Sequence, residues 1–228
     1  MTLLLAYNVV FAKYGKQFVN KGRFISIEGG EGAGKSTSVA FIQEFLQGQG
    51  VDLVSTREPG GTQLSEQLRQ LLLNHHDENI DPYAELLMIF AARRQHVAQV
   101  IQPALAAGKW VLCDRFTDAS YAYQGYGREL PLAFIDNLAN WVHGDTNPDM
   151  TFLLDLDIEV GMSRARQRSE LDRIESEAMP FFEAVRQGYL CLAKAEPERF
   201  RVIDASQDIL GVEQQLQQAL EGLLAEQV

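Results

Sequence analysis

The chain has 228 residues, with 20 basic and 31 acidic side chains and a formal net charge of −11 at pH 7. Its hydrophobic fraction of 46% and charged fraction of 22% are typical of a chain that buries a large core, and they exclude a disordered protein, a collagen-like fibre and a coiled coil. The length indicates a single domain, with room for a small lid. The acidic balance argues against nucleic-acid binding, which depends on basic side chains that neutralise phosphates.

Short apolar strands alternate with longer helical patterns along the chain. Strands are predicted at 24–27, 51–54, 110–113, 151–154 and 200–203. Helices are predicted at about 35–47, 62–74, 82–107, 131–143, 158–168, 175–195 and 208–225. Two of the strands are apolar without alternation, which is typical of central strands covered on both faces. The pattern therefore predicts one α/β domain of βαβ units, with a parallel sheet of five strands between two layers of helices.

Residues 1–20 form an N-terminal extension to the predicted domain at 21–228, and the sequence leaves open whether the extension is ordered. No basic region precedes its apolar start, so we do not expect a signal peptide. No apolar stretch approaches the ~20 residues of a membrane-spanning helix. Cys113 lies in an apolar run and is expected to be a buried, reduced thiol. The four histidines share no metal-ligand spacing and are expected to be ordinary surface or core residues. These features favour a cytoplasmic protein without a membrane partner.

A glycine-rich turn follows the first predicted strand. Residues 29–36 read GGEGAGKS and match the P-loop pattern G-x-x-x-x-G-K-[ST], with an amphipathic helix after them. The glycines let successive backbone N–H groups point at one anion, and the start of the helix adds positive dipole charge. We expect Lys35 to reach the β- and γ-phosphates of a nucleotide and Ser36 to ligate Mg²⁺. The surrounding strand and helix argue against a chance glycine-rich turn.

Charged residues follow two other predicted strands. Asp114 and Arg115 come directly after the third, and Glu58 lies in a glycine-rich turn, 57–62, after the second. Because ligands bind at the carboxyl ends of strands in open α/β sheets, these residues are expected to face the same crevice as the P-loop. Asp114 would hold Mg²⁺ through water, and Arg115 would bridge two phosphate oxygens. A surface ion pair is the alternative for this dipeptide. The Glu58–Pro59 bond is a candidate for the cis form.

A basic cluster follows the fourth predicted strand, at Arg164, Arg166, Arg168 and Arg173. Arg164 and Arg168 are four residues apart and therefore lie on one face of a helix. The polar stretch that follows has few core residues, which is typical of a mobile lid, expected at about 161–175. A solvated helix face, partly neutralised by nearby acidic residues, is the alternative.

Together these motifs resemble the bacterial thymidylate kinases. The resemblance rests on residues 27–37, 56–62, 114–124 and 170–175, which read IEGGEGAGKST, TREPGGT, DRFTDASYAYQ and ELDRIE. It implies the three-layer P-loop NTPase fold with a small lid, and transfer of the ATP γ-phosphoryl group to dTMP with Mg²⁺, in dTTP synthesis. It also implies a homodimer. Another nucleoside monophosphate kinase and a P-loop regulatory ATPase remain the alternatives.

The resemblance also implies individual roles. Glu31 is similar to the acidic residue near the deoxyribose 3′-hydroxyl, and Arg69 and Arg115 resemble the arginines that hold the dTMP phosphate. Arg93 resembles the arginine that contacts thymine, while Ile89 and Phe90 are rivals for stacking on the base. Tyr123 is similar to a residue that forms a wall of the nucleotide pocket and would crowd the 2′-hydroxyl of a ribose. Gly32 occupies the place where another type of the family carries a basic residue, so the lid arginines are expected to replace it.

The expected site falls into four overlapping groups. The donor nucleotide is expected at Gly29, Gly30, Glu31, Gly32, Ala33, Gly34, Lys35, Ser36, Thr37, Arg164 and Arg168. The acceptor is expected at Glu31, Arg57, Glu58, Arg69, Phe90, Arg93, Arg115, Ser120, Tyr123 and Gln124. The expected catalytic residues are Lys35, Arg115 and Arg168, and the expected metal ligands are Ser36 and Asp114. No general base is nominated, because an acceptor phosphate oxygen is already anionic and positioning with charge neutralisation does most of the work.

Overall fold

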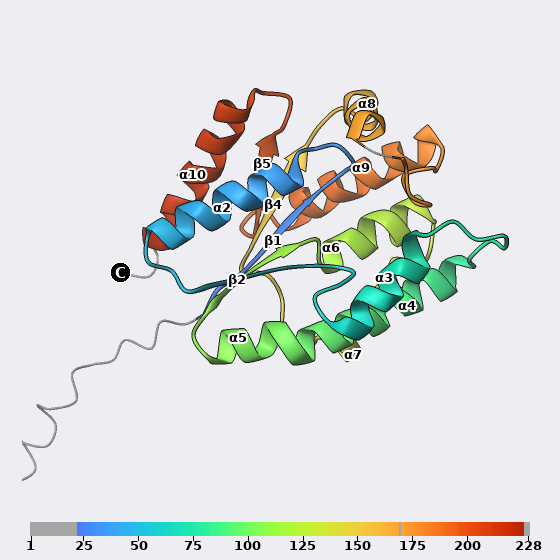
Figure 1. The fold of residues 1–228 in the computed structure, drawn as a ribbon, viewed down its shortest axis with the longest axis horizontal. Coiled ribbons are helices and arrows are strands. Elements are labelled where there is room, and N and C mark those ends of the chain that lie inside the picture. Colours follow the sequence, from blue (N-terminus) through green and yellow to red (C-terminus); the bar gives the residue numbers. More distant parts are fainter. Residues whose placement is uncertain (1–21, 169, 226–228) are drawn as a thin grey trace, which may run out of the picture.

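A computed structural model describes residues 22–168 and 170–225, so the predicted extension at 1–20 lies outside the described residues (Figure 1). Five parallel strands form one sheet in the order β2-β3-β1-β4-β5. The strands are β1 (Phe24–Gly29), β2 (Leu53–Arg57), β3 (Trp110–Asp114), β4 (Met150–Asp155) and β5 (Phe200–Asp204). The predicted five-stranded parallel sheet is therefore confirmed. The second strand starts later than predicted, because Gly50 (φ 78°) and the hydrogen bond from Val51 N to Leu46 O still belong to the preceding helix end.

The helices also follow the predicted order. They are α2 (Lys35–Gly48), α3 (Gln63–Leu73), α4 (Pro82–His96), α5 (Gln102–Ala106), α6 (Thr117–Ser120), α7 (Leu132–Val142), α8 (Ile158–Arg168), α9 (Met179–Ala195) and α10 (Ile209–Ala225). The predicted helix at 82–107 comprises α4 and α5, joined by the π-helical segment η1 (Val97–Ile101). Its start is capped by the Asp81 side chain, which accepts from Tyr83 N and Ala84 N.

Two helical regions differ from the sequence prediction. The segment after Phe116 forms α6 and the π-helical η2 (Tyr121–Gly127), which the sequence did not predict. The helix predicted at 175–195 begins only at Met179. The preceding turn is closed by Asp172, whose Oδ1 accepts from Ile174 N at 2.9 Å and from Glu175 N at 2.8 Å. Because this side chain satisfies the backbone locally, the chain forms a turn where a helix was expected.

The sheet is covered on both faces, as the apolar central strands predicted. Ile25 and Ile27 of β1 pack in one core cluster with Ile42 of α2 and Leu216 of α10. On the opposite face, Phe24 packs with residues of η1, α5 and β3, and a second cluster surrounds α9. Figure 1 shows α2 and α10 on one side of the sheet and α5 on the other. None of the helices in the described parts of the chain is both long and apolar enough to cross a bilayer.

The strand order brings the motifs to one edge. β1 pairs with β3 and with β4, so the P-loop that follows β1 lies in the centre of the carboxyl edge. Ile27 of β1 lies opposite Asp114 of β3, and Arg57 of β2 also lies opposite Asp114. The ends of three adjacent strands, each followed by one of the predicted motifs, therefore meet at one place.

Candidate active site

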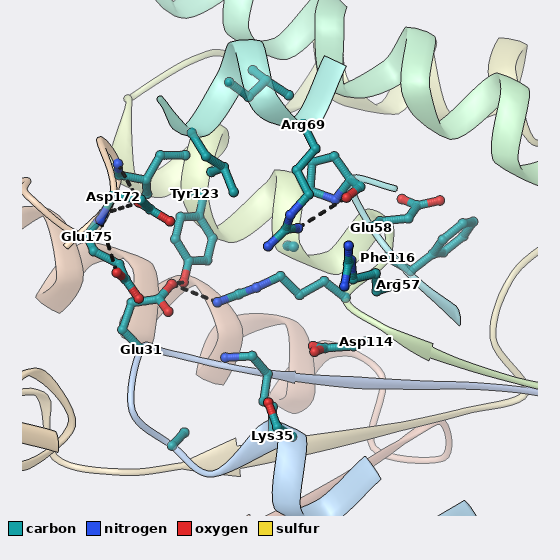
Figure 2. Close-up of a pocket in the computed structure, with 18 of the residues that line it drawn as sticks. Glu31, Lys35, Arg57, Glu58, Arg69, Asp114, Phe116, Tyr123, Asp172 and Glu175 are labelled. Carbon is teal, nitrogen blue, oxygen red and sulfur yellow. Dashed lines mark hydrogen bonds and ion pairs between the residues drawn. The ribbon is translucent and has the colours of Figure 1, made fainter. Parts of the chain in front are cut away.

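A cavity of about 410 Å³ opens at the carboxyl ends of β1, β2 and β3. The P-loop forms one side, and the turn after β2 with the ends of α3 and η2 forms the other. The lid contributes Asp172, Ile174 and Glu175. Figure 2 shows Lys35 and Arg69 on opposite sides of this space, with Asp114 on the same side as Lys35. The motifs that lie far apart in the sequence thus line one cavity.

The P-loop holds Lys35 close to its own backbone. The Nζ atom donates to Gly30 O at 2.8 Å and to Gly29 O at 3.1 Å. Burial, and then the positive charge of Arg115, lower the pKa of Lys35 to about 8, while the carboxylates of Glu31 and Asp114 oppose this shift. The amine therefore lies inside the loop at the start of α2, where a bound polyphosphate would favour its protonated form.

The lid helix α8 packs directly against the P-loop. Gly32 has a φ of 66°, and a Cβ atom on it would collide with the carbonyl oxygen of Gly161 in α8. A Cβ on Gly161 would in turn collide with the carbonyl oxygen of Glu31. This glycine-to-glycine contact lets Arg164 line the cavity, as the sequence predicted for the donor site. Arg164 also lines a second cavity of about 520 Å³, which shares Gly32 and Gly34 with the first and extends to the start of α10.

Arg115 lies between the P-loop and the far wall. It has an unusual φ of 67°, and its Nη1 donates to Gly29 O at 3.1 Å and to the Tyr189 hydroxyl at 3.2 Å. Its Nη2 donates to Glu31 Oε1 at 2.7 Å, which also accepts from the Tyr123 hydroxyl at 2.7 Å. The guanidinium lies 4.8 Å from the centre of the Tyr123 ring. Several contacts therefore fix the orientation of this cation beside the P-loop.

Glu28 is a site-supporting residue that the sequence analysis missed. It is the last carboxylate before the P-loop glycines and is completely buried. Its Oε1 accepts from Phe116 N at 2.6 Å, and its Oε2 accepts from the Tyr189 hydroxyl at 2.7 Å. Burial, with the charge of Asp118, raises the pKa of Glu28 to about 8. A carboxylate inside an apolar strand was the available signal, and the structure shows that it ties the segment after β3 to β1.

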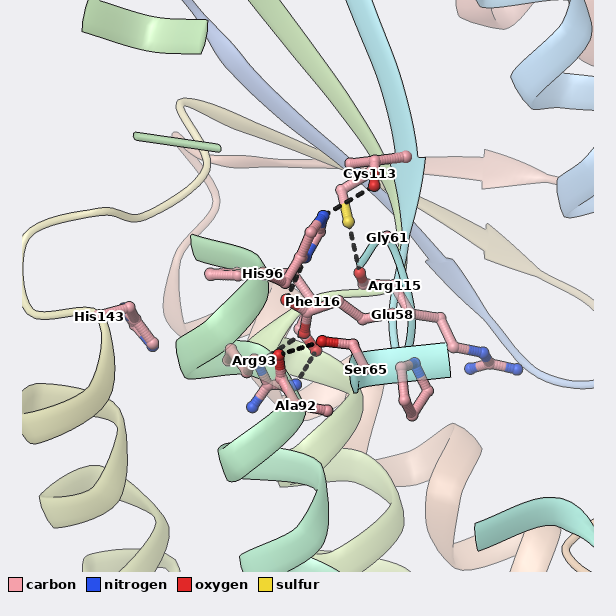
Figure 3. Close-up of polar contacts among 12 residues, drawn as sticks. Glu58, Gly61, Ser65, Ala92, Arg93, His96, Cys113, Arg115, Phe116 and His143 are labelled. Carbon is pink, nitrogen blue, oxygen red and sulfur yellow. Dashed lines mark hydrogen bonds and ion pairs between the residues drawn. The ribbon is translucent and has the colours of Figure 1, made fainter. Parts of the chain in front are cut away.

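A second buried carboxylate, Glu58, organises the acceptor side (Figure 3). Arg93 donates from Nε to Glu58 Oε2 at 2.7 Å and from Nη1 to Ser120 Oγ at 3.0 Å. His96 Nδ1 lies 2.9 Å from Glu58 Oε1, and its Nε2 lies 2.7 Å from Thr56 Oγ1. Burial alone would raise the pKa of Glu58, but Arg93 and His96 together lower it. The Glu58–Pro59 peptide is cis, as the turn suggested.

His96 was assigned no role from the sequence, yet it is completely buried in this network. Its ring bridges Thr56 of β2 and Glu58, so it fixes the carboxylate that in turn fixes Arg93. Spacing alone could not reveal this contact, because His96 and Glu58 are 38 residues apart.

Most of the predicted site residues line the cavity. They include Glu31, Gly32, Ala33, Gly34, Lys35, Ser36, Thr37, Arg57, Glu58, Arg69, Arg93, Asp114, Arg115, Ser120, Tyr123, Gln124 and Arg164. Arg69 also donates from Nη1 to Pro59 O at 3.1 Å, whereas Arg57 is half exposed and pairs with Glu66 at 2.9 Å. Gly29 and Gly30 contribute the carbonyl groups that hold Lys35. The Arg168 side chain lies outside the described residues, so its role stays a prediction.

The structure corrects two expectations. Phe90 is buried in a core cluster with Leu86 and Ile135, and the Arg93 guanidinium lies 4.6 Å from its ring centre. Ile89, its neighbour on α4, lines the cavity instead and replaces Phe90 as the apolar candidate for base contact. The second correction concerns Arg173 of the predicted basic cluster, which donates to Leu72 O and Glu85 behind the cavity wall.

Asp114 offers a place for a cation. Its Oδ1 atom is buried and has no hydrogen-bond partner among the described residues, and the side chain lines the cavity together with Ser36. A carboxylate and a hydroxyl are hard oxygen donors of the kind that suits Mg²⁺. The residues present therefore fit the predicted metal, which Ser36 would hold directly and Asp114 through water.

Known proteins identify the family. The family model described as thymidylate kinase matches residues 27–216. The chain belongs to the thymidylate kinase family. The expected family is thereby confirmed, and the match begins beyond the predicted N-terminal extension.

Similar thymidylate kinases cover nearly the same part of the chain. The protein of Teredinibacter turnerae is 54% identical over 203 residues, which span 89% of this chain and 99% of that protein. The protein of Pseudomonas fluorescens is 52% identical over 203 residues, or 89% of this chain and 97% of that protein. The crystal structure of thymidylate kinase from Ehrlichia chaffeensis superimposes with a TM-score of 0.72 at 37% identity, covering 88% of this chain and 98% of that one. The predicted P-loop NTPase fold is therefore confirmed as well.

Proposed function

We propose that this protein transfers the γ-phosphoryl group of ATP to dTMP, producing dTDP and ADP. One observation carries the proposal. In this member of the thymidylate kinase family, the P-loop and a separate set of arginines line the same cavity from opposite sides. An ATPase needs only the first of these. A phosphate acceptor needs the second, because two polyanions must approach each other against their mutual repulsion.

The donor nucleotide is proposed to lie along the P-loop. Its β- and γ-phosphates would contact the backbone N–H groups and Lys35, and its base would lie in the second cavity between Arg164 and the start of α10. Mg²⁺ held by Ser36 and Asp114 would neutralise charge on the β- and γ-phosphate oxygens. The predicted contribution of Arg168 from the lid belongs to the same end of the site.

The acceptor is proposed to occupy the opposite end of the first cavity. Arg69 and Arg115 would hold the dTMP phosphate, and Arg57 would contribute at its exposed rim. Thymine would lie against Ile89, with Arg93 at its polar edge. The remaining proposed contacts, around the base and sugar, are Glu31, Glu58, Ser120, Tyr123 and Gln124.

The chemistry asked of these side chains is positioning and charge neutralisation. The acceptor oxygen is anionic, so no proton has to be removed before it attacks the γ-phosphorus in line with the leaving ADP. Lys35 and Arg115 both donate to the Gly29 carbonyl oxygen and are therefore neighbouring cations beside the P-loop. Both would favour the charge that spreads over the oxygens of the transferred group. Closure of the lid would exclude water, which would otherwise compete with dTMP as acceptor.

We also propose a cytoplasmic homodimer that has no nucleic-acid partner. Support for the dimer comes from large apolar side chains exposed on α3 and α4, namely Leu64, Leu71 and Leu87. Sedimentation of the purified protein tests this part, since a dimer would have twice the mass of the chain.

A panel of monophosphate acceptors tests the proposed function. With ATP and Mg²⁺, kcat/KM should be highest for dTMP, with dUMP tolerated and AMP, GMP and CMP poor. Preference for another monophosphate would favour a different nucleoside monophosphate kinase. Steady ADP release without an acceptor, responsive to a protein partner, would favour the regulatory ATPase.

A further inference from the structure

Behind the acceptor side of the cavity lies a buried ionic cluster around Glu85 of α4. The Glu85 side chain is 1% exposed and accepts four hydrogen bonds. Its Oε2 accepts from Arg173 Nη2 at 2.6 Å and from Arg128 Nη2 at 3.2 Å. Its Oε1 accepts from Gln124 Nε2 at 2.9 Å and from Arg128 Nε at 3.3 Å. A carboxylate this deeply buried is retained only with such compensation.

The three partners of Glu85 come from two segments beside the cavity, the lid turn and the end of η2, and one of them also contacts α3. Arg173 belongs to the lid, and it also donates from Nε to Leu72 O at 2.8 Å and from its backbone N to Leu73 O at 3.0 Å at the end of α3. Gln124 belongs to η2 and itself lines the cavity. Arg128 follows η2 and donates from Nη1 to Glu177 Oε1 at 2.6 Å, beyond the lid turn. One carboxylate therefore connects the lid, α3 and η2.

The lid is thus attached at two places. Its helix α8 meets the P-loop through the contact between Gly32 and Gly161, on the donor side. The turn at 170–178 meets the acceptor walls through Arg173 and Glu85. Glu85, Arg128 and Arg173 do not line the cavity, so their effect on a bound molecule must pass through the walls that they hold.

The two neighbouring guanidinium groups favour the ionised form of Glu85 over the protonated form. Two guanidinium groups, each 15% exposed, converge on the Glu85 carboxylate. Burial by itself would raise the pKa of Glu85, but Gln124, Arg128 and Arg173 together lower it, so the group is ionised at neutral pH. Loss of this charge would leave two like charges, Arg128 and Arg173, facing each other beside the lid turn.

We propose that Glu85 is a positioning residue for phosphoryl transfer: through Arg173 and Gln124 it holds the lid turn and η2 in the arrangement that binds the acceptor. The inference rests on the proposed function, since it assigns the acceptor to this end of the cavity. The proposal predicts different effects on the two substrates. Because Glu85 takes no part in the contact between α8 and the P-loop, its loss should weaken acceptor binding and leave ATP binding nearly unchanged.

Kinetics of Glu85→Gln, Arg173→Gln and the double variant test the proposal. Each single variant should raise the KM for dTMP about tenfold, the size expected of a coupled buried network, and should change the KM for ATP less than about twofold. The double variant should raise the KM for dTMP by less than the product of the two single effects, because both changes break the contact between Glu85 and Arg173. Hydrogen exchange of the substrate-free protein should become faster at 170–178 in all three variants and stay unchanged in α8.

A matched control and hydrogen exchange without substrate distinguish a positioning role of Glu85 from a general loss of stability. Glu196→Gln removes a carboxylate from an exposed pair with Arg199 (2.8 Å) and should leave both KM values and the exchange at 170–178 unchanged. Two results would overturn the proposal. One is a double variant whose KM for dTMP rises by the full product of the two single effects. The other is a fall in thermal stability while the KM for dTMP and the exchange at 170–178 stay unchanged. Should Glu85→Gln fail to fold, the less buried Arg173→Gln alone decides through the same two readouts. If the wild-type protein phosphorylated another acceptor, the proposed function would fail, while the exchange experiment would still test the contact.

Discussion

The two ends of the cavity are built in different ways. At the donor end, the anion site is made of backbone: glycines, N–H groups at the start of α2, and Lys35 bonded to carbonyls of its own loop. At the acceptor end, the cations are held by side chains from distant segments, such as Arg93 on Glu58 and Arg115 on Glu31. A backbone site depends on a short continuous sequence, whereas a side-chain site depends on the whole fold. Substitutions at the donor end should therefore lower mainly turnover, whereas substitutions at the acceptor end should lower both protein stability and dTMP binding.

Removal of the donor-end cation should give the largest effect. Lys35→Ala deletes the amine that would neutralise the β- and γ-phosphates, so kcat should fall by about 10³-fold, comparable to the loss of a group that stabilises transition-state charge. Binding of dTMP, measured by calorimetry, should remain. A variant that keeps most of its turnover would contradict the role of the P-loop lysine.

Breaking the acceptor network should damage stability as well as binding. Glu58→Gln leaves the buried Arg93 without its charged partner, so the free energy of unfolding should fall by about 3 kcal/mol and the KM for dTMP should rise. Denaturant unfolding and steady-state kinetics measure the two effects. The exposed Glu44→Gln on α2 is the control and should change neither. If Glu58→Gln altered only the KM for ATP, the division between the two ends would be wrong.

The protonation of Lys35 should appear in the pH profile. Its pKa lies below the ordinary lysine value, at about 8, so the free enzyme loses the charge above that pH. The value of kcat/KM for ATP, which reports the free enzyme, should then fall about tenfold per pH unit above pH 8. The kcat profile should stay flat to higher pH, because bound triphosphate favours the protonated amine. In Lys35→Arg this alkaline limb should disappear from whatever activity remains; a persisting limb would assign it to another group.

The smallest effect is expected where the two ends touch. Tyr123→Phe removes the hydroxyl that donates to Glu31 Oε1 but keeps the ring beside Arg115. A hydrogen bond to a charged group contributes about 1.5–3 kcal/mol. Because the ring remains in place, we expect a loss at the lower end of this range, so kcat/KM for dTMP should fall about tenfold, with little change in the KM for ATP. Equal losses for both substrates would show that the contact serves the donor end too.

The same contrast explains what could be read from the sequence. The P-loop and the strands before and after it were predictable, because each depends on neighbouring residues and on apolar runs. The segment that forms α6 and η2 was not, because its glycines and tyrosines resemble a loop until packing against α9 shapes it. Residues 175–178 form the end of the lid turn where the sequence pattern predicts the start of a helix, because Asp172 caps the backbone locally.

Supporting residues of the acceptor end were the least predictable. Ile89 and Phe90 are adjacent on an apolar helix, and only the packing of α4 decides which one faces the cavity. Glu28, His96 and Glu85 are polar residues inside apolar patterns, and their partners lie tens of residues away. Local spacing in the sequence does not predict contacts between residues so far apart, so the function of these residues can be recognised only in the folded structure.

The most direct test follows the label from γ-labelled ATP. Incubated with this protein, Mg²⁺ and dTMP, the label should appear in dTDP in step with ADP formation, and little should be released as inorganic phosphate when dTMP is left out. Label released mainly as inorganic phosphate, at a rate that dTMP does not change, would contradict a cavity in which donor and acceptor meet.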